Sequence, residues 1–198
     1  MSLGGDSSEI QRDYKVVQKL VALRPVFEVY DESTGQMVAV ARQTWTSIFR
    51  STVNFEDAGG NRILTAKGGF LSKTFWLLDA SGQKVAKITR PWIALRKSFK
   101  IIYRDEEIKA QGGYLAIGFE ARSAGGSFAF KLNKKILAVR DQFRVSVGSY
   151  VDWLHAIAMA IIVDRVFFRG SGCGLRCICC LGLLAVLFIA TLSLMLMP

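Results

Sequence analysis

Residues 27–45, FEVYDESTGQMVAVARQTW, and residues 75–92, FWLLDASGQKVAKITRPW, are two copies of one motif. In each copy, two apolar stretches rich in β-forming residues flank a polar turn that runs from an Asp to a Gly, as from Asp31 to Gly35. The copies begin about 48 residues apart, and each ends on a Trp. A strand, a turn and a second strand that recur in this way predict β-hairpins built to a common plan.

Similar hairpin-like segments follow each copy, at residues 47–66 and 95–113, and a third, degraded copy begins near residue 118. Together with a strand expected at residues 14–20, these segments predict about 12 antiparallel strands. A sheet of that length tends to curl and close, because closure removes its unpaired edges. The expected fold class is therefore mainly β, a closed antiparallel barrel of about 12 strands.

Residues 152–164, DWLHAIAMAIIVD, break the β pattern. Asp152 stands where an N-cap would, and apolar side chains cover almost every side of the segment between its two acids. The segment is too short to cross the ~30 Å hydrocarbon layer of a bilayer. We predict a helix over about residues 152–168 that is buried inside the barrel, where strands alone would leave a hollow interior.

Residues 177–198, CICCLGLLAVLFIATLSLMLMP, are 22 residues without a charge. As a helix they would be roughly 33 Å long, enough to cross the bilayer. Arg165, Arg169 and Arg176 lie upstream and nothing charged follows, so the positive-inside rule puts the preceding head in the cytosol. With no visible signal peptide, this predicts a single-pass, tail-anchored membrane protein. The alternative is a core helix of the head, which would need a larger core than the head offers.

The composition fits one basic domain joined to an apolar tail. The chain has 198 residues, 51% of them hydrophobic, and its 26 Lys+Arg against 16 Asp+Glu give a formal net charge of +10. The expected organisation is a flexible N-terminal arm over residues 1–13, the barrel with its helix over 14–169, a juxtamembrane linker over 170–176 and the transmembrane tail over 177–198.

All the cysteines cluster at the start of the apolar tail. A cytosolic head keeps them as thiols, and juxtamembrane cysteines are common sites of reversible palmitoylation, which strengthens membrane binding through the buried acyl chain. Two alternatives stay open: thiolates spaced as CGLRCICC that hold a soft metal ion, and small apolar residues of a helix entrance. The candidate acylation sites are Cys173, Cys177, Cys179 and Cys180.

Basic residues gather in two hairpin regions of the head. On a tethered head the nearest polyanion is the lipid surface, which attracts each nearby basic residue by about 1 kcal/mol. The alternative is that these charges are solvated strand faces, while nucleic acid is disfavoured because a tail anchor confines the head to a membrane and no aromatic-basic stacking motif is evident. The candidate anionic-lipid-binding residues are Arg90, Arg96, Lys97, Lys100, Lys131, Lys134, Lys135 and Arg140, with Lys15, Lys19 and Arg24 adding charge near the start.

Nothing in the sequence predicts an enzyme. His155, the one His, lies in the apolar helix, where a hydrogen-bonded core histidine is more common than a catalytic base, and no Ser or Cys nucleophile is spaced to pair with it. Four glycine pairs resemble phosphate loops, but none opens a helix, so we expect turns. These pairs are residues 59–60, 68–69, 112–113 and 125–126. No catalytic residue, metal or cofactor is expected.

The hairpins and the helix together resemble the tubby C-terminal-like superfamily and, within it, the LURP-one-related and phospholipid scramblase-like branch. The resemblance covers residues 14–168 and rests on YDESTGQMVAV, LDASGQKVAKI, the final strand QFRVSVGSY and, most specifically, VDWLHAIAMAIIVDRVFF. It implies a twelve-stranded barrel around a central C-terminal helix, with phosphoinositide as a possible ligand. Scramblases carry an acid-rich calcium-binding stretch before the helix, whereas residues 146–152 hold one acid, which argues against calcium control.

Three functions are expected from these features. The first is a non-enzymatic, membrane-tethered barrel that binds anionic phospholipid or phosphoinositide, or acts as a membrane scaffold. The second is scramblase-like translocation of phospholipid between leaflets, which would need a homo-oligomer because one apolar helix offers headgroups no path. The third is a protein-interaction module that binds a protein partner, with the membrane serving only as its address.

Overall fold

The computed structural model describes residues 10–19, 25–45, 50–69, 74–90, 98–112, 118–134 and 142–164. These residues form twelve strands and one helix, and the first six strands are contributed by residues before position 80. The strands are β1 (Ile10–Gln18), β2 (Val26–Asp31), β3 (Met37–Trp45), β4 (Arg50–Asp57), β5 (Arg62–Gly69), β6 (Thr74–Asp79), β7 (Lys84–Thr89), β8 (Ser98–Tyr103), β9 (Glu106–Gly112), β10 (Gly118–Ser123), β11 (Phe128–Lys134) and β12 (Gln142–Gly148).

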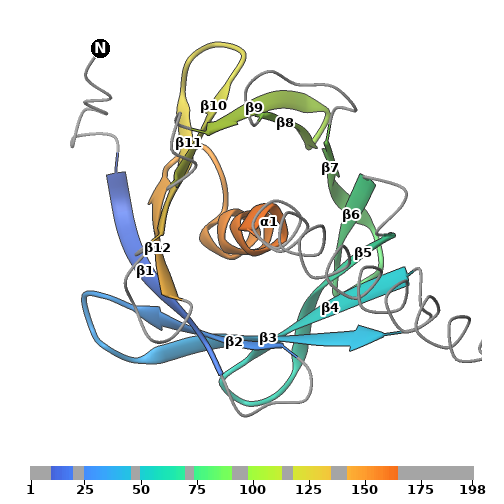
Figure 1. Cartoon of the computed structure of the whole chain (residues 1–198), viewed down its shortest axis with the longest axis vertical. Helices are drawn as coiled ribbons and strands as arrows, with labels where there is room; N and C mark the ends of the chain where they lie inside the picture. Colours follow the sequence, from blue (N-terminus) through green and yellow to red (C-terminus); the bar gives the residue numbers. More distant parts are fainter. Residues whose placement is uncertain are drawn as a thin grey trace, which may run out of the picture. The chain divides into compact units, whose positions relative to one another are not determined.

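The strands form a closed antiparallel barrel in which each strand pairs with its neighbours in sequence (Figure 1). β1 completes the closure because it pairs with both β2 and β12. The predicted barrel of about 12 antiparallel strands is therefore confirmed. The barrel lies in the compact unit Met1–Ile162; of the second unit, Val163–Pro198, the structure describes residues 163–164.

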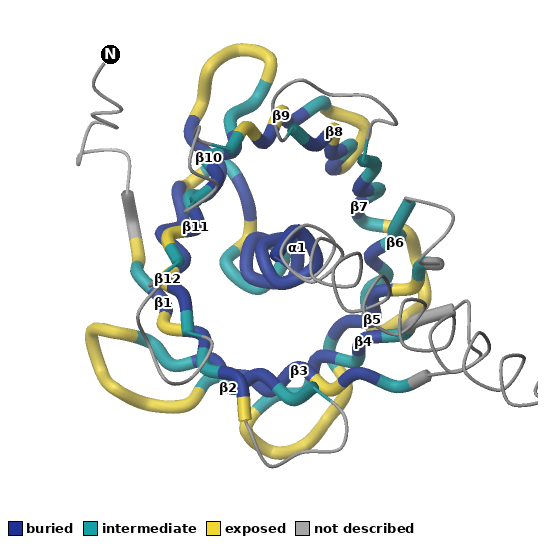
Figure 2. Tube along the Cα trace, viewed as in Figure 1, coloured by how far each residue is buried: buried dark blue, intermediate teal, exposed yellow. Residues whose placement is uncertain are grey.

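Buried residues alternate with more exposed ones along most of the strands, whereas β11 and β12 hold runs of three and four buried residues (Figure 2). In β2, Phe27 and Val29 are buried, whereas Glu28 and Tyr30 between and beyond them are only half-buried. Successive side chains of a strand point to opposite faces, so a sequence that alternates apolar and polar residues places the apolar ones inside the barrel and the polar ones outside it.

In both copies of the motif, the Asp side chain accepts a hydrogen bond from a backbone N–H of the turn that follows it. Asp31 Oδ1 accepts a hydrogen bond from the backbone N–H of Ser33 at 2.8 Å, and Asp79 Oδ1 accepts one from the N–H of Gln83 at 2.9 Å. Gly35 and Gly82 follow at φ of 70° and 85°, in the left-handed region that favours glycine. The Asp-to-Gly spacing in the sequence therefore reflects an Asp side chain that caps each turn.

The helix α1 (Trp153–Asp164) runs through the barrel interior (Figure 1). Asp152 caps its start, since its Oδ1 accepts a hydrogen bond from the N–H of Leu154 at 2.9 Å. Every residue from Ala156 to Val163 is buried, as expected for a segment that is apolar on all sides. The predicted buried helix is confirmed over these residues, and its predicted continuation over residues 165–168 lies outside the described part of the chain.

Two aromatic contacts join the start of the helix to the wall. The ring of Trp153 stacks on Tyr14 of β1, with centroids 5.3 Å apart and planes inclined by 17°. His155 Nδ1 lies 3.0 Å from the hydroxyl oxygen of Tyr103 on β8. The helix is thus held by strands far apart in the barrel order, which fixes its rotation about its own axis.

The start of the first strand and the role of two glycine pairs differ from what the sequence predicted. The first strand begins at Ile10, inside the expected arm, because Ile10 pairs with Gly148 at the end of β12. The glycine pair at 68–69 ends β5 and is not a turn, and Gly112 likewise lies in β9. A Cβ on Gly68 would come within 2.2 Å of the Phe75 ring, so the glycine admits that ring from the neighbouring strand.

The predicted linker, the apolar tail over residues 177–198 and the candidate acylation sites lie outside the described residues. Within the described ranges, no helix combines the length and the apolar character needed to cross a membrane.

Candidate functional site

The described members of the predicted basic clusters include two lysines that are paired with carboxylates. Lys100 Nζ lies 2.7 Å from Glu107 Oε2, and this hydrogen bond is the main reason that the pKa of Glu107 is below its usual value. Lys131 Nζ lies 3.7 Å from Glu120 Oε2. Glu107 also lies 4.0 Å from Lys109 Nζ, and Glu120 also accepts a hydrogen bond from Arg122 at 2.8 Å, so each carboxylate offsets part of the positive charge of two cations.

The other predicted residues fall in different environments. Arg90, just after β7, and Lys134, at the end of β11, are half-buried. Near the start of the chain, Lys19 Nζ lies 2.6 Å from Glu28 Oε1. The predicted residues outside the described part of the chain are Arg24, Arg96, Lys97, Lys135, Arg140, Cys173, Cys177, Cys179 and Cys180.

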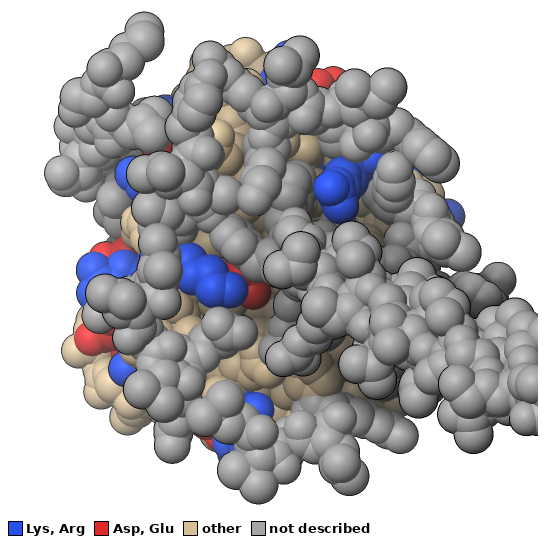
Figure 3. Space-filling model, viewed as in Figure 1, with Lys and Arg blue, Asp and Glu red and all other residues tan. Residues whose placement is uncertain are grey.

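Lysines that the sequence analysis did not single out surround Trp76 on the outer wall. Trp76, on β6, stands directly opposite Lys67 of β5 and Lys87 of β7. The Nζ atoms of Lys84 and Lys87 lie 4.4 and 5.1 Å from the centroid of the Trp76 ring. We call these four residues the Trp76 platform. On the face that Figure 3 draws, Lys and Arg side chains lie near β7, and further Lys and Arg side chains lie among acidic ones near β12 and β1.

The lysines of the Trp76 platform differ from Lys19, Lys100, Lys109 and Lys131, each of which lies within 4.0 Å of a carboxylate oxygen. Within the described residues, no carboxylate forms an ion pair with Lys67, Lys84 or Lys87. Lys67 and Lys84 are exposed, whereas Lys87 and Trp76 are half-buried. The result is a concentration of positive charge around one indole ring.

A polar groove of about 380 Å³ adjoins the Trp76 platform. Lys67 belongs to both, and Arg62 adds a second exposed cation to the groove. The remaining lining is mostly hydroxyl and amide side chains and the β6–β7 turn. We call it the β3–β6 groove; it is lined by Thr44, Thr52, Asn54, Arg62, Thr65, Lys67, Leu78, Asp79, Ala80, Ser81 and Gly82.

Register explains why the groove and the platform adjoin. Thr44 pairs with Thr52, and Thr52 pairs in turn with Lys67. Lys67 pairs with Trp76, and Trp76 pairs with Lys87. These five residues form one row across five strands on the outer wall. With strands ~4.8 Å apart, the row extends roughly 19 Å.

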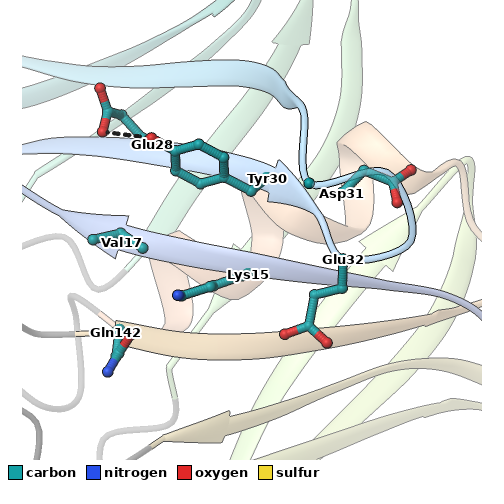
Figure 4. Close-up of a pocket in the computed structure, with 8 residues that line it drawn as sticks. Lys15, Val17, Glu28, Tyr30, Asp31, Glu32 and Gln142 are labelled. Atoms are coloured by element: carbon teal, nitrogen blue, oxygen red, sulfur yellow. Dashed lines mark hydrogen bonds between the residues drawn. The ribbon is translucent and has the colours of Figure 1, made fainter.

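A second groove, of about 510 Å³, lies on another part of the outer wall (Figure 4). The groove presents three carboxylates and one lysine, Lys15. Glu28 accepts hydrogen bonds from Lys19 and, at 3.0 Å, from the Tyr30 hydroxyl, and the bond with Lys19 is the main cause of its lowered pKa. Glu32 pairs with Arg144 at 2.8 Å. We call it the β1–β2 groove; it is lined by Lys15, Val17, Glu28, Tyr30, Asp31, Glu32, Gly35 and Gln142.

His155 has the surroundings of a structural residue. Burial lowers its pKa, which favours the neutral imidazole, and its Nδ1 shares a hydrogen bond with the hydroxyl of Tyr103. The hydrogen bond expected for His155 is therefore present, on a side chain that is half-buried. Among the described residues, no group of three or more His, Cys, Asp or Glu side chains could hold a metal ion.

One signal in the sequence could have indicated the Trp76 platform. Alternation over residues 74–89 places Trp76 and Lys87 on the outer face of their hairpin. Lys67, however, joins them only through the register between β5 and β6, which the sequence does not reveal.

A family model described as LURP-one-related matches residues 12–164. The match runs from β1 to the last residue of α1 and so includes all twelve strands and the helix. No curated protein matches the chain.

Proposed function

The chain belongs to the LURP-one-related family, within the tubby-like superfamily, and on that premise we propose that it is a non-enzymatic, membrane-tethered barrel that binds anionic phospholipid. The Trp76 platform is the proposed contact with the lipid surface. The observation that carries the proposal is the meeting of three lysines around an outward-facing indole, without an ion-paired carboxylate among the described residues.

The charge of the Trp76 platform suits a layer of phosphates. Lys84 and Lys87 approach the same ring, so their like charges repel, and an anion between them would relieve that repulsion. Three lysines at about 1 kcal/mol each correspond to roughly 3 kcal/mol of attraction to an anionic surface. Tryptophan favours the headgroup region, because its ring is apolar and its N–H can donate a hydrogen bond.

The β3–β6 groove supports a phosphoinositide as a preferred lipid. The hydroxyls of Thr44 and Thr52 could bond the hydroxyls of a sugar-like headgroup, and Arg62 and Lys67 could bind its phosphates. Glycerophospholipids without such hydroxyls would use the Trp76 platform alone.

The proposal includes the membrane anchor. Residues 177–198 would cross the bilayer once with the barrel in the cytosol, and Cys173, Cys177, Cys179 and Cys180 would carry reversible acyl chains. Tethering raises the effective concentration of lipid at the barrel surface, so a weak contact would suffice for docking. In this arrangement the barrel could also act as a membrane scaffold.

Lysine labelling on reconstituted full-length chain tests the proposal. The chain is placed in phosphatidylcholine vesicles with or without phosphatidylserine, and acetylation of each lysine is followed by mass spectrometry. We expect labelling at Lys67, Lys84 and Lys87 to slow several-fold only with phosphatidylserine, and to recover at high salt. Lys15, exposed in the β1–β2 groove, is the internal control. Equal rates in both vesicles would contradict lipid binding by the platform.

A protein-interaction module is the second candidate, and the β1–β2 groove favours it. Glu28, Asp31 and Glu32 give this groove an acidic lining that would suit a basic peptide better than a phospholipid. Lipid translocation finds less support, because the described helix is apolar and enclosed and offers no polar path to a headgroup.

A further inference from the structure

We propose that Lys84 and Lys87 act as a cap on Trp76 that an anionic lipid surface removes, so that the indole enters the headgroup layer only where anionic lipid is present. The inference rests on the proposed function, since it concerns how the same platform responds to the membrane. The inference adds a conformational change to that function, because lysines could bind phosphate without exposing the tryptophan to the bilayer.

The first support is the position of Trp76. Its side chain leaves β6 on the outer wall, whereas the ring of Trp153, which is half-buried like Trp76, stacks on the buried Tyr14. The two lysines over the Trp76 ring both come from β7. An indole on the outer wall that contacts two ammonium groups is partly shielded by side chains that can turn away without any change in the backbone.

The second support is the balance between competing contacts. A cation over an exposed aromatic ring is attracted weakly, to about the same extent as one lysine near an anionic membrane. Lipid phosphates would offer charge-assisted hydrogen bonds to Lys84 and Lys87 in place of the ring. Neutral lipid lacks the net negative charge that attracts both lysines together, so the cap would stay closed on a neutral surface.

The third support is an apolar surface beside the ring. Leu78 lies two residues along β6, and Ile102 of β8 stands directly opposite Lys87. Both are half-buried on the outer wall. When the lysines turn toward phosphates, Trp76, Leu78 and Ile102 would present a continuous apolar surface to the upper part of the bilayer.

The test measures tryptophan fluorescence of the full chain in vesicles that contain phosphatidylcholine brominated on the uppermost part of its acyl chains, which quenches emission from rings that enter the layer just below the headgroups. The contribution of Trp76 is obtained by subtracting the signal of Trp76→Phe. We expect this contribution to be quenched at least several-fold more strongly with phosphatidylserine than without it, and the difference to vanish at high salt. Wild-type chain labelled with 5-fluorotryptophan gives the same readout by fluorine NMR without a substitution.

Removing the cap provides a second arm. In Lys84→Met/Lys87→Met the ring is no longer covered by ammonium groups, and we expect quenching of Trp76 to become independent of phosphatidylserine. Lys100→Met/Lys109→Met, which removes the same charge from positions paired with Glu107, is the matched control and should behave as wild type.

The outcomes separate the two proposals. If lysine labelling slows on anionic vesicles while Trp76 quenching does not change, the cap is wrong and lipid binding stands. If neither changes, both proposals are wrong. If quenching is equally strong with and without phosphatidylserine in wild type, Trp76 enters the bilayer unaided and the cap is again wrong.

Discussion

The Trp76 platform and the β1–β2 groove belong to the same barrel wall and are built on the same alternation, yet their charges differ. In the β1–β2 region, Glu28 meets Lys19 and Glu32 meets Arg144. Around Trp76, the side chain opposite Lys67 and Lys87 on the adjacent strand is an uncharged indole and not a carboxylate. The number of lysines in a segment therefore does not determine the charge of a β surface, because the residue on the adjacent strand decides whether each lysine is neutralised.

The largest expected effect comes from removing the charge of the Trp76 platform. Lys67→Gln/Lys84→Gln/Lys87→Gln should lose about 100-fold in affinity for anionic vesicles, from roughly 1 kcal/mol for each lysine. The affinity is measured as partition of the full chain, held in neutral nanodiscs, onto phosphatidylserine vesicles.

The matched control removes three lysines that lie within 4.0 Å of Glu107 or Glu120, in Lys100→Gln/Lys109→Gln/Lys131→Gln. We expect a loss of less than about tenfold, because these two carboxylates already offset part of the charge of the three lysines. Equal losses in the two variants would mean that net charge governs binding, and the distinction between the two surfaces would fail.

The next largest effect is expected when the carboxylates of the β1–β2 region are removed, so that its cations become unpaired like those of the Trp76 platform. Glu28→Gln/Glu32→Gln removes the carboxylates that pair with Lys19 and Arg144. We expect a gain of up to about tenfold in vesicle affinity, since the β1–β2 region then presents unpaired cations. The gain should appear with slower acetylation of Lys15 and Lys19 on vesicles. An unchanged affinity would show that unpaired lysines alone do not make a lipid-binding surface.

Acid should have a smaller effect in the same direction. The pKa of Glu28 is lowered, chiefly by its hydrogen bond with Lys19, so the carboxylate keeps its charge below the ordinary range near 4.5 and loses it as the pH falls through the lowered value. We expect partition of the chain onto phosphatidylglycerol vesicles to increase a few-fold in that window. The Glu28→Gln chain, which lacks this titrating carboxylate, should show a smaller step.

The smallest effect on binding is expected at the turns, which the two regions share. Gly35 borders the β1–β2 groove and Gly82 the β3–β6 groove, both at positive φ and both with open space where a Cβ would be. Gly35→Ala and Gly82→Ala should each lower the free energy of unfolding by about 1 kcal/mol, from backbone strain alone. Urea unfolding checks this, and neither variant should change vesicle affinity. A binding loss confined to Gly82→Ala would assign the turn itself to the lipid contact.

Local patterns were enough to predict most of the fold. Alternating apolar residues and Asp-to-Gly turns specify hairpins because both act over a few neighbouring residues, as Asp79 does when it caps its turn. Burial of α1 followed from its length and its lack of a polar side. The prediction of a turn at residues 68–69 was wrong, because these glycines end β5, and Gly68 leaves room for the Phe75 ring on the next strand.

The candidate site was much less predictable from the sequence. Lys100 and Lys131 stand in visibly basic segments, but strand pairing gives each a carboxylate partner. The partner of Arg144 is Glu32, which is 112 residues away along the chain. Lys67, Lys84 and Lys87 did not stand out as a cluster, although the barrel brings them to one ring.

The hairpins, their turns and the helix that fills the barrel could be predicted from local sequence, because hydrogen-bonded turns and period-two burial are local properties. Which charges are neutralised depends instead on how the folded barrel pairs its strands. That distinction depends on register, since a shift of one residue between β5 and β6 would turn Lys67 away from Trp76. Electrostatic interactions act over a few ångströms in space, and the barrel, not the distance along the chain, sets those separations.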